Sequence, residues 1–182
     1  MTRDSLFTRL SSVHRPNCAL FEDGPLPAAV PSPEVMARNF GSEAAARYAE
    51  SCQPIYEDLR RVVGQLAGLA ILTQLTASAE VLDLGELDSC RSRWQHAADH
   101  LAELNVPANL QEHFRQLEAA HIFSGQTLRS FSTLRYRREN EDIFESIARQ
   151  VQRAYAHLRA ASSEKAGLEM VDFTHACCSC GA

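Results

Sequence analysis

The sequence predicts an all-α fold, an antiparallel bundle of about four long helices. Apolar residues recur at intervals of three and four over long stretches, which places them on one face of a helix. No stretch shows the sustained alternation of apolar and polar residues that is typical of a half-buried strand. The connections between the periodic stretches are short, and short connections make consecutive helices antiparallel neighbours. We therefore expect one helical domain at 34–167, between an irregular arm at 1–33 and a flexible tail at 168–182.

The N-terminal arm is expected to be irregular because of its prolines. Proline fixes φ and lacks a backbone donor, so neither a continuous helix nor a central strand fits this segment. We interpret it as an arm packed along the body, with a partner-binding segment as the alternative. The helical domain begins where a serine that can act as a cap precedes a proline suited to the first helical position, at Ser32-Pro33-Glu34. The prolines of the arm are Pro16, Pro25, Pro27, Pro31 and Pro33.

The first helix is expected to run from 34 to about Cys52, and Gly41-Ser42 can interrupt it. Pro54 then either kinks this helix or opens a new one, because proline removes a hydrogen bond from a helix interior. From Cys52 a clear apolar stripe predicts a helical face that continues to about Ala77. This stripe consists of Cys52, Ile55, Leu59, Val62, Leu66 and Leu69.

Three further stripes predict three more helices. After a connector at 78–85, the second helix continues to Asn105-Val106-Pro107, where proline stops it. The third begins near Asn109 and ends or bends in the polar run 135–140. The fourth begins near Glu141, and Gly167 is suited to terminate it. The stripes are Leu87, Cys90, Trp94, Ala97, Leu101 and Leu104; then Leu110, Phe114, Leu117, His121, Ser124, Leu128 and Phe131; then Ile143, Ile147, Val151, Ala154, Leu158 and Ala161.

Composition limits the class of function. The chain has 182 residues, 45% of them hydrophobic and 23% charged, with a formal net charge of −5. This balance argues against binding to nucleic acid, which favours a basic face. No run approaches the roughly 20 apolar residues of a membrane span, and the N-terminus lacks a secretory signal. We therefore expect a cytoplasmic protein, whose six cysteines are thiols, metal ligands or redox groups rather than structural disulfides.

The C-terminal tail is chemically distinct from the rest of the chain. Its candidate metal ligands, His175, Cys177, Cys178 and Cys180, lie within six residues of one another. Thiolate and imidazole suit copper(I), zinc and iron. Cys177 and Cys180 form a Cys-x-x-Cys pair, a spacing that lets two sulfurs meet one ion. The leading hypothesis is that the tail binds a soft transition metal, or engages a partner protein by thiol chemistry.

Three alternatives for the tail remain open. It can be a mobile redox or persulfide-carrying arm, it can be the substrate of a modifying enzyme with the bundle as recognition element, or its thiols can be incidental. In composition it is similar to the modified end of a ribosomal precursor peptide. A single Cys-x-x-Cys does not close a zinc site, which takes its second ligand pair from elsewhere. The second contributor would be Cys18 or His14, another copy of the chain in a homo-oligomer, or a separate protein that donates or accepts the metal.

The helical body offers two weaker candidates. Glu118 and His121 form a Glu-x-x-His, of which carboxylate-bridged di-iron bundles use two, and a bundle enzyme with a buried non-haem metal is one interpretation. The other interpretation is a buried neutral histidine. His96 and His100 have the i, i+4 spacing of metal ligands, although a solvated polar face is the simpler interpretation.

The sequence favours a non-enzymatic protein. It contains no glycine-rich nucleotide loop, no Gly-x-Ser-x-Gly and no His-Glu-x-x-His. Cys52 and Cys90 fall on the apolar stripes, and we interpret both as core packing, because cysteine behaves as a small buried hydrophobe.

Overall fold

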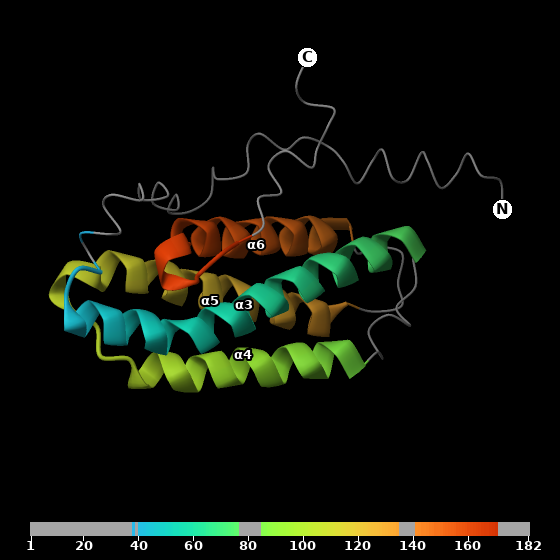
Figure 1. Cartoon of the computed structure of the whole chain (residues 1–182). Helices are drawn as coiled ribbons and strands as arrows, with labels where there is room; N and C mark the ends of the chain where they lie inside the picture. Colours follow the sequence, from blue (N-terminus) through green and yellow to red (C-terminus); the bar gives the residue numbers. More distant parts are fainter. Residues whose placement is uncertain (1–37, 39, 77–84, 135–140, 171–182) are drawn as a thin grey trace, which may run out of the picture.

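The computed structural model describes residues 38, 40–76, 85–134 and 141–170. It confirms the all-α bundle. Four long helices lie side by side and antiparallel (Figure 1): α3 (Glu43–Thr76), α4 (Gly85–Glu103), α5 (Gln111–Thr133) and α6 (Glu141–Ala160). Two short 3-10 turns, η2 (Ala108–Leu110) and η3 (Glu164–Ala166), precede α5 and follow α6. Within these ranges no β-strand occurs, and the only sheet-like pairing is an isolated bridge between Ser163 and Leu168.

The structure decides both points that the sequence left open in the first helix. The predicted break at Gly41-Ser42 is confirmed, since α3 begins at Glu43 and the Ser42 hydroxyl accepts the Ala45 N–H at 3.2 Å as its cap. Of the two alternatives at Pro54, no new helix opens there, because α3 spans 34 residues with Pro54 inside it. Pro54 lies on an exposed side of the helix, where water can satisfy the carbonyl left without an N–H partner.

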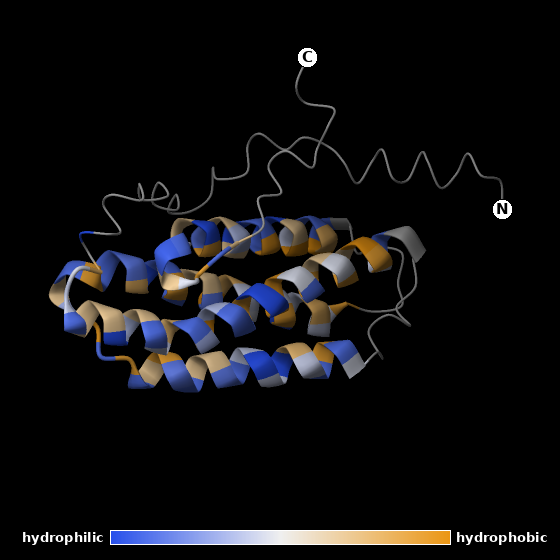
Figure 2. Cartoon of the chain, in the orientation of Figure 1, coloured by the Kyte–Doolittle hydropathy of each residue, from blue (hydrophilic) through white to orange (hydrophobic). Residues whose placement is uncertain are grey.

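The predicted apolar stripes form the core. Figure 2 shows each helix with an apolar and a polar side. The stripe of α3 is the most deeply buried part, and α3 packs against α4, α5 and α6. Its positions Cys52, Ile55, Leu59, Val62, Leu66 and Leu69 are all buried. Removing this apolar surface from water supplies the main driving force for the fold.

The chain leaves the bundle later than the sequence suggested. Gly167 adopts the left-handed conformation expected of a terminator (φ 67°), but it closes η3 rather than α6. Leu168 follows it into the core with no exposed surface, and its backbone pairs with Ser163 in both directions at 2.7 and 2.9 Å. The Gln53 side chain fixes the same turn by donating to the Ala166 carbonyl at 3.0 Å. Leu168 therefore belongs to the packed domain.

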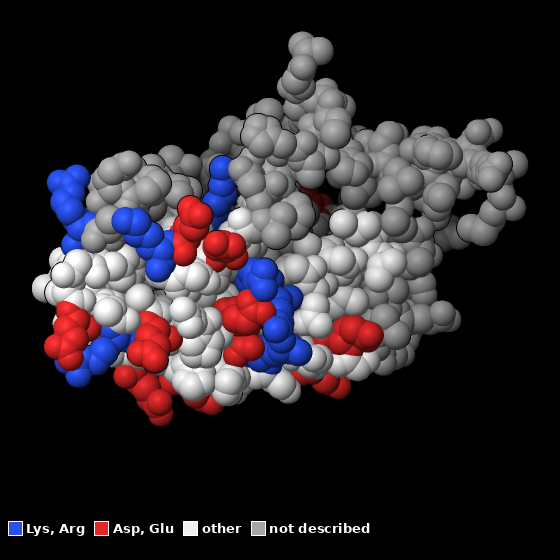
Figure 3. All heavy atoms as spheres, viewed as in Figure 1, with Lys and Arg blue, Asp and Glu red and all other residues white. Residues whose placement is uncertain are grey.

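The charged side chains of the bundle are interspersed in sign. Figure 3 shows acidic and basic groups mixed over the visible face. Several form ion pairs within one helix, such as Glu57 with Arg60 and Arg61 at 2.6 and 2.7 Å. None of the helices in the described ranges has a stretch both long and apolar enough to cross a membrane.

Candidate metal centre

The tail ligands His175, Cys177, Cys178 and Cys180 lie outside the described residues, as do His14 and Cys18. The metal site predicted there stays a prediction. The structure describes candidate donor atoms in the bundle, where five of the seven histidines lie.

The histidine pair of α4 has converging ring nitrogens. His96 and His100 lie one turn apart, with their ring centroids 4.4 Å apart and their planes nearly perpendicular at 82°. The two Nε2 atoms are 3.2 Å from each other. Helical spacing places the two residues on one face, and the ring orientations bring the two potential donor atoms together.

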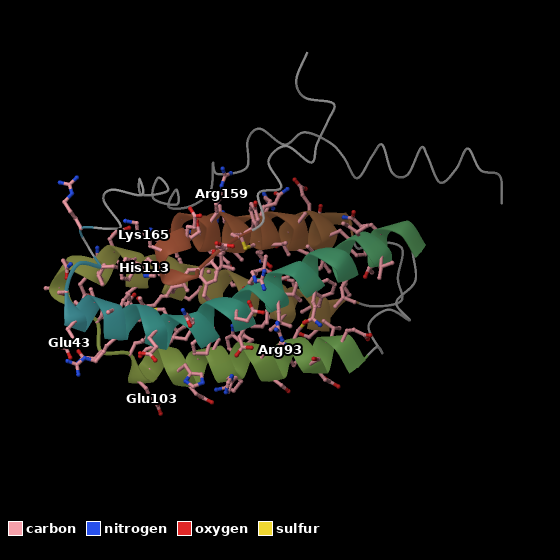
Figure 4. The ribbon with its side chains drawn as sticks, in the orientation of Figure 1. Glu43, Arg93, Glu103, His113, Arg159 and Lys165 are labelled. Carbon is pink, nitrogen blue, oxygen red and sulfur yellow. The ribbon has the colours of Figure 1, made fainter. Side chains whose placement is uncertain are left out.

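A carboxylate from α3 holds one of these rings. The Oδ2 atom of Asp58 lies 2.7 Å from His96 Nδ1, and Arg93 Nη1 lies 3.8 Å from the other carboxylate oxygen. Only 15% of the Asp58 side chain is exposed, against 61% of the His96 side chain. Figure 4 labels Arg93 on α4, on the side nearest α3. The arrangement fixes the inner side of the imidazole and leaves its outer side to solvent.

Asp58 is the residue that sequence reasoning missed at this site. It lies 38 positions before His96, so its position depends on the register between α3 and α4. One feature of the sequence could have indicated Asp58. It directly precedes Leu59, at the edge of the buried stripe, where a polar side chain can reach the neighbouring helix.

The structure does not provide the buried metal site that one interpretation placed at Glu118 and His121. Glu118 is exposed, whereas a site inside a bundle needs its carboxylates to project inward. His121 is half-buried, stacked on Trp94 with centroids 4.5 Å apart, and its Nε2–H donates to the Trp94 carbonyl at 3.2 Å. The Trp94 indole N–H donates back to the His121 carbonyl at 2.9 Å. Burial lowers the pKa of His121, partly opposed by that hydrogen bond, so the neutral-histidine interpretation describes this residue.

His113 is a buried histidine that sequence reasoning did not single out. Its Nδ1 faces the Tyr48 hydroxyl at 2.9 Å, and its Nε2 faces the Ala161 carbonyl at 2.9 Å. A carbonyl can only accept, so Nε2 carries the hydrogen and Nδ1 accepts from the tyrosine. Burial lowers the pKa of His113, and the hydrogen bond to Ala161 opposes this shift in part. Both nitrogens serve the packing of α3, α5 and the segment after α6.

His157 is a second buried histidine that sequence reasoning did not single out. Its Nδ1 lies 2.7 Å from Gln116 Oε1, while its Nε2 is buried without a hydrogen-bond partner. The His157 ring stacks on the Phe123 ring with their centroids 5.5 Å apart. The Arg153 guanidinium lies over the Phe123 ring, 5.3 Å from its centroid. Burial, and then the charge of Arg153, lower the pKa of His157. The residue is held neutral, and its free nitrogen faces packed side chains rather than solvent.

The cysteines of the bundle are packing residues, as predicted. Cys52 and Cys90 have no exposed surface and form no disulfide. Burial raises the pKa of each thiol to about 11. The Cys90 thiol donates weakly to Gln65 Oε1 at 3.4 Å across the contact between α3 and α4. Thiols this poorly ionised are weak nucleophiles and weak metal ligands at neutral pH.

A shallow depression beside α3 offers no comparable chemistry. Two of its charged groups pair with each other, since Arg60 contacts Glu57 at 2.6 Å. Although partial burial opposes ionisation of Glu57, hydrogen bonds from Arg60 and Arg61 lower its pKa overall. The residues around it are Gln53, Tyr56, Glu57, Arg60, Gly167 and Glu169.

Comparison with known proteins gives no identity for the chain. No protein family, curated protein or solved structure matches it. Within the described ranges, no three histidine, cysteine or acidic side chains gather around one point as a complete metal cluster. The histidine pair brings two potential donor atoms together.

Proposed function

We propose that this chain binds a soft transition-metal ion through its C-terminal tail and exchanges it with a partner protein, with the helical bundle as the carrier. The observation that carries the proposal is the clustering of potential metal ligands in the tail. Cys177, Cys178 and Cys180 stand with His175 within six residues. Cysteine is rarely exposed in such clusters without a chemical use, because free thiols oxidise.

The bundle supports this proposal by accounting for two other cysteines. Cys52 and Cys90 are buried, with pKa values raised to about 11, so packing explains their presence. The cysteines that packing in the described residues does not explain are Cys18 and the three of the tail. The thiol chemistry of the chain is thus concentrated outside the bundle.

The donor set indicates the class of ion. Thiolates with one imidazole suit copper(I), zinc or iron, and a reducing cytoplasm keeps such thiols available. A Cys-x-x-Cys pair supplies two ligands to one ion, and a closed site takes the others from a second segment. An incompletely closed site suits transfer, because an acceptor protein can supply the missing ligands. A second copy of the chain could supply them in the same way.

Metal titration of the full chain tests the proposal. Copper(I) or Zn²⁺ is titrated into wild type and into a Cys177→Ser, Cys178→Ser, Cys180→Ser triple variant under reducing conditions. We expect the triple variant to lose tightly bound metal. Cys90→Ala, which removes one core thiol, is the matched control and retains it. Equal stoichiometry and affinity in wild type and the triple variant would contradict the proposal.

A second candidate function rests on the composition of the same tail, where Ser179 and Gly181 accompany the cysteines. Such a terminus fits the substrate of a cysteine-modifying enzyme that recognises the bundle. The intact mass of the chain purified from its native host separates the two. A mass shift localised to 171–182 supports modification, and an unmodified mass across growth conditions counts against it.

A further inference from the structure

We infer that His96 and His100 form a separate metal site on the surface of α4, which binds a borderline divalent ion such as Cu²⁺, Ni²⁺ or Zn²⁺. This site lies beyond the soft-metal chemistry proposed for the tail and does not depend on it. Two observations carry it: the distance between the two Nε2 atoms, and the contact of Asp58 with the far side of one ring.

The separation of the two nitrogens fits two ligands of one ion. The Nε2 atoms of His96 and His100 are 3.2 Å apart. Zinc–nitrogen bonds of about 2.0–2.1 Å that meet at an angle of roughly 100° span the same distance, and this angle is close to tetrahedral. An ion can thus enter between the rings with small adjustments of two side chains.

Asp58 sets the hydrogen on His96 for metal binding. A carboxylate accepts but does not donate, so the 2.7 Å contact places the ring hydrogen on Nδ1. The lone pair then lies on Nε2, which accepts the hydrogen of His100 Nε2 at 3.2 Å. An ion takes the place of that hydrogen once His100 carries its own hydrogen on Nδ1. Carboxylate, histidine and metal in this order are usual in protein metal sites, where the carboxylate orients the ring.

The supporting carboxylate is itself fixed. Asp58 is only 15% exposed, and Arg93 approaches its second oxygen at 3.8 Å. The same helix contact is closed by the Cys90 thiol against Gln65. Asp58 therefore reaches across a packed boundary between α3 and α4, whereas the ring it holds is 61% exposed and accessible to an ion from solvent.

The ligand chemistry identifies the class of ion. Imidazole suits zinc, copper and nickel, and affinity for a nitrogen site rises towards Cu²⁺ in this series. Asp99 and Glu103, both exposed on α4, add negative charge near the pair, which Arg93 partly offsets. Two protein ligands leave further coordination positions open to water or to an added donor.

The test uses the full chain carrying the Cys177/Cys178/Cys180→Ser changes, so that tail thiols contribute nothing. Cu²⁺ is titrated and followed by electron paramagnetic resonance, and Zn²⁺ by calorimetry. We expect one ion per chain with nitrogen hyperfine structure from two imidazoles. His100→Ala should leave one nitrogen donor and weaken binding at least tenfold, and His96→Ala/His100→Ala should abolish it. His96 is exposed and His100 is partly exposed, and circular dichroism verifies that each variant is folded.

Asp58→Asn tests the supporting carboxylate against a matched control. We expect it to weaken Cu²⁺ and Zn²⁺ binding by about 10–100-fold, the usual effect of losing an outer-shell partner. Asp99→Asn removes the same charge from α4, the helix that carries both histidines. The Asp99 carboxylate accepts from Gln95 at 3.1 Å and not from either ring, so we expect little change. Unaltered binding in the double alanine variant would overturn the inference, as would equal effects of Asp58→Asn and Asp99→Asn. The soft-metal proposal for the tail stands or falls separately, on wild type against the triple serine variant.

Discussion

Acid should unfold this bundle steeply because two of its histidines are buried in the neutral form. His113 and His157 are only 8% and 3% exposed. Burial lowers both pKa values below the ordinary 6.5, so the unfolded chain takes up the proton first as the pH falls. The stability that these neutral histidines contribute is fully present above about pH 6.5 and is lost as the pH falls below that value.

The contacts of the His113 and His157 rings explain why protonation of either ring destabilises the folded state. A proton on His113 Nδ1 would displace the Tyr48 hydroxyl hydrogen that this atom accepts. A proton on His157 Nε2 would create a buried N–H donor without an acceptor, and Arg153 would repel the new charge. Both cases leave a buried polar or charged group unsatisfied, which is costly.

The magnitude follows from proton linkage. A histidine that is charged when unfolded and neutral when folded changes the free energy of unfolding by about 1.4 kcal/mol per pH unit. Between about pH 7 and pH 5 the loss is roughly 2 kcal/mol for each such histidine. His113 and His157 together therefore remove up to about 4 kcal/mol, a large part of the ~5–15 kcal/mol typical of a domain.

Urea unfolding at several pH values measures this effect, with Trp94 fluorescence and circular dichroism as probes. His113→Gln or His157→Gln should each reduce the pH slope below pH 6.5 by up to about 1.4 kcal/mol per unit, whatever the absolute stability. Phe123→Leu is the control, since it disturbs the packing on His157 without removing a titrating group. A wild-type slope in both glutamine variants would refute the reasoning.

Three further predictions concern packing. Gly125→Ala should destabilise the fold by about 1–3 kcal/mol, because its Cβ would lie 2.7 Å from the Trp94 ring, and thermal unfolding measures this. Gly64→Ala, at a helix position with nothing within 4 Å, should instead stabilise by roughly 0.5–1 kcal/mol, and a loss there would show that the helix-propensity argument fails. Cys52 and Cys90, with pKa values near 11, should resist alkylation until the chain unfolds, as followed by peptide mass spectrometry; rapid labelling in the native state would contradict their burial.

The fold could be predicted from sequence because its main signal is local. The interval between apolar residues places them on one helical face wherever the helix lies, and the α3 stripe from Cys52 to Leu69 is buried as expected. The behaviour of Pro54 was not predictable in the same way. Proline carries a local cost, but tertiary packing on both sides of it holds α3 continuous.

In the candidate site too, the residues that share a local sequence pattern could be predicted, and those that depend on tertiary packing could not. The i, i+4 spacing of His96 and His100 is local, and the sequence identified it. Asp58 was not identifiable, because its contact with His96 depends on the register of two packed helices. His113 was missed because a histidine beside an apolar stripe resembles a surface residue, and its partners Tyr48 and Ala161 are distant in sequence.

Hydrogen-bond partners, rather than motif spacing, separate the histidines of the bundle by role. By spacing alone, the Glu118–His121 motif resembles a metal site as much as the α4 pair does. In the structure, the Nε2 atoms of His121 and His113 are hydrogen-bonded to backbone carbonyl groups. The Nε2 atom of His157, which has no hydrogen-bond partner, is buried. The α4 pair differs, because an anchored His96 presents its outer nitrogen to His100 at an accessible surface. Metal binding in the bundle should therefore respond to changes at α4 and not at α5.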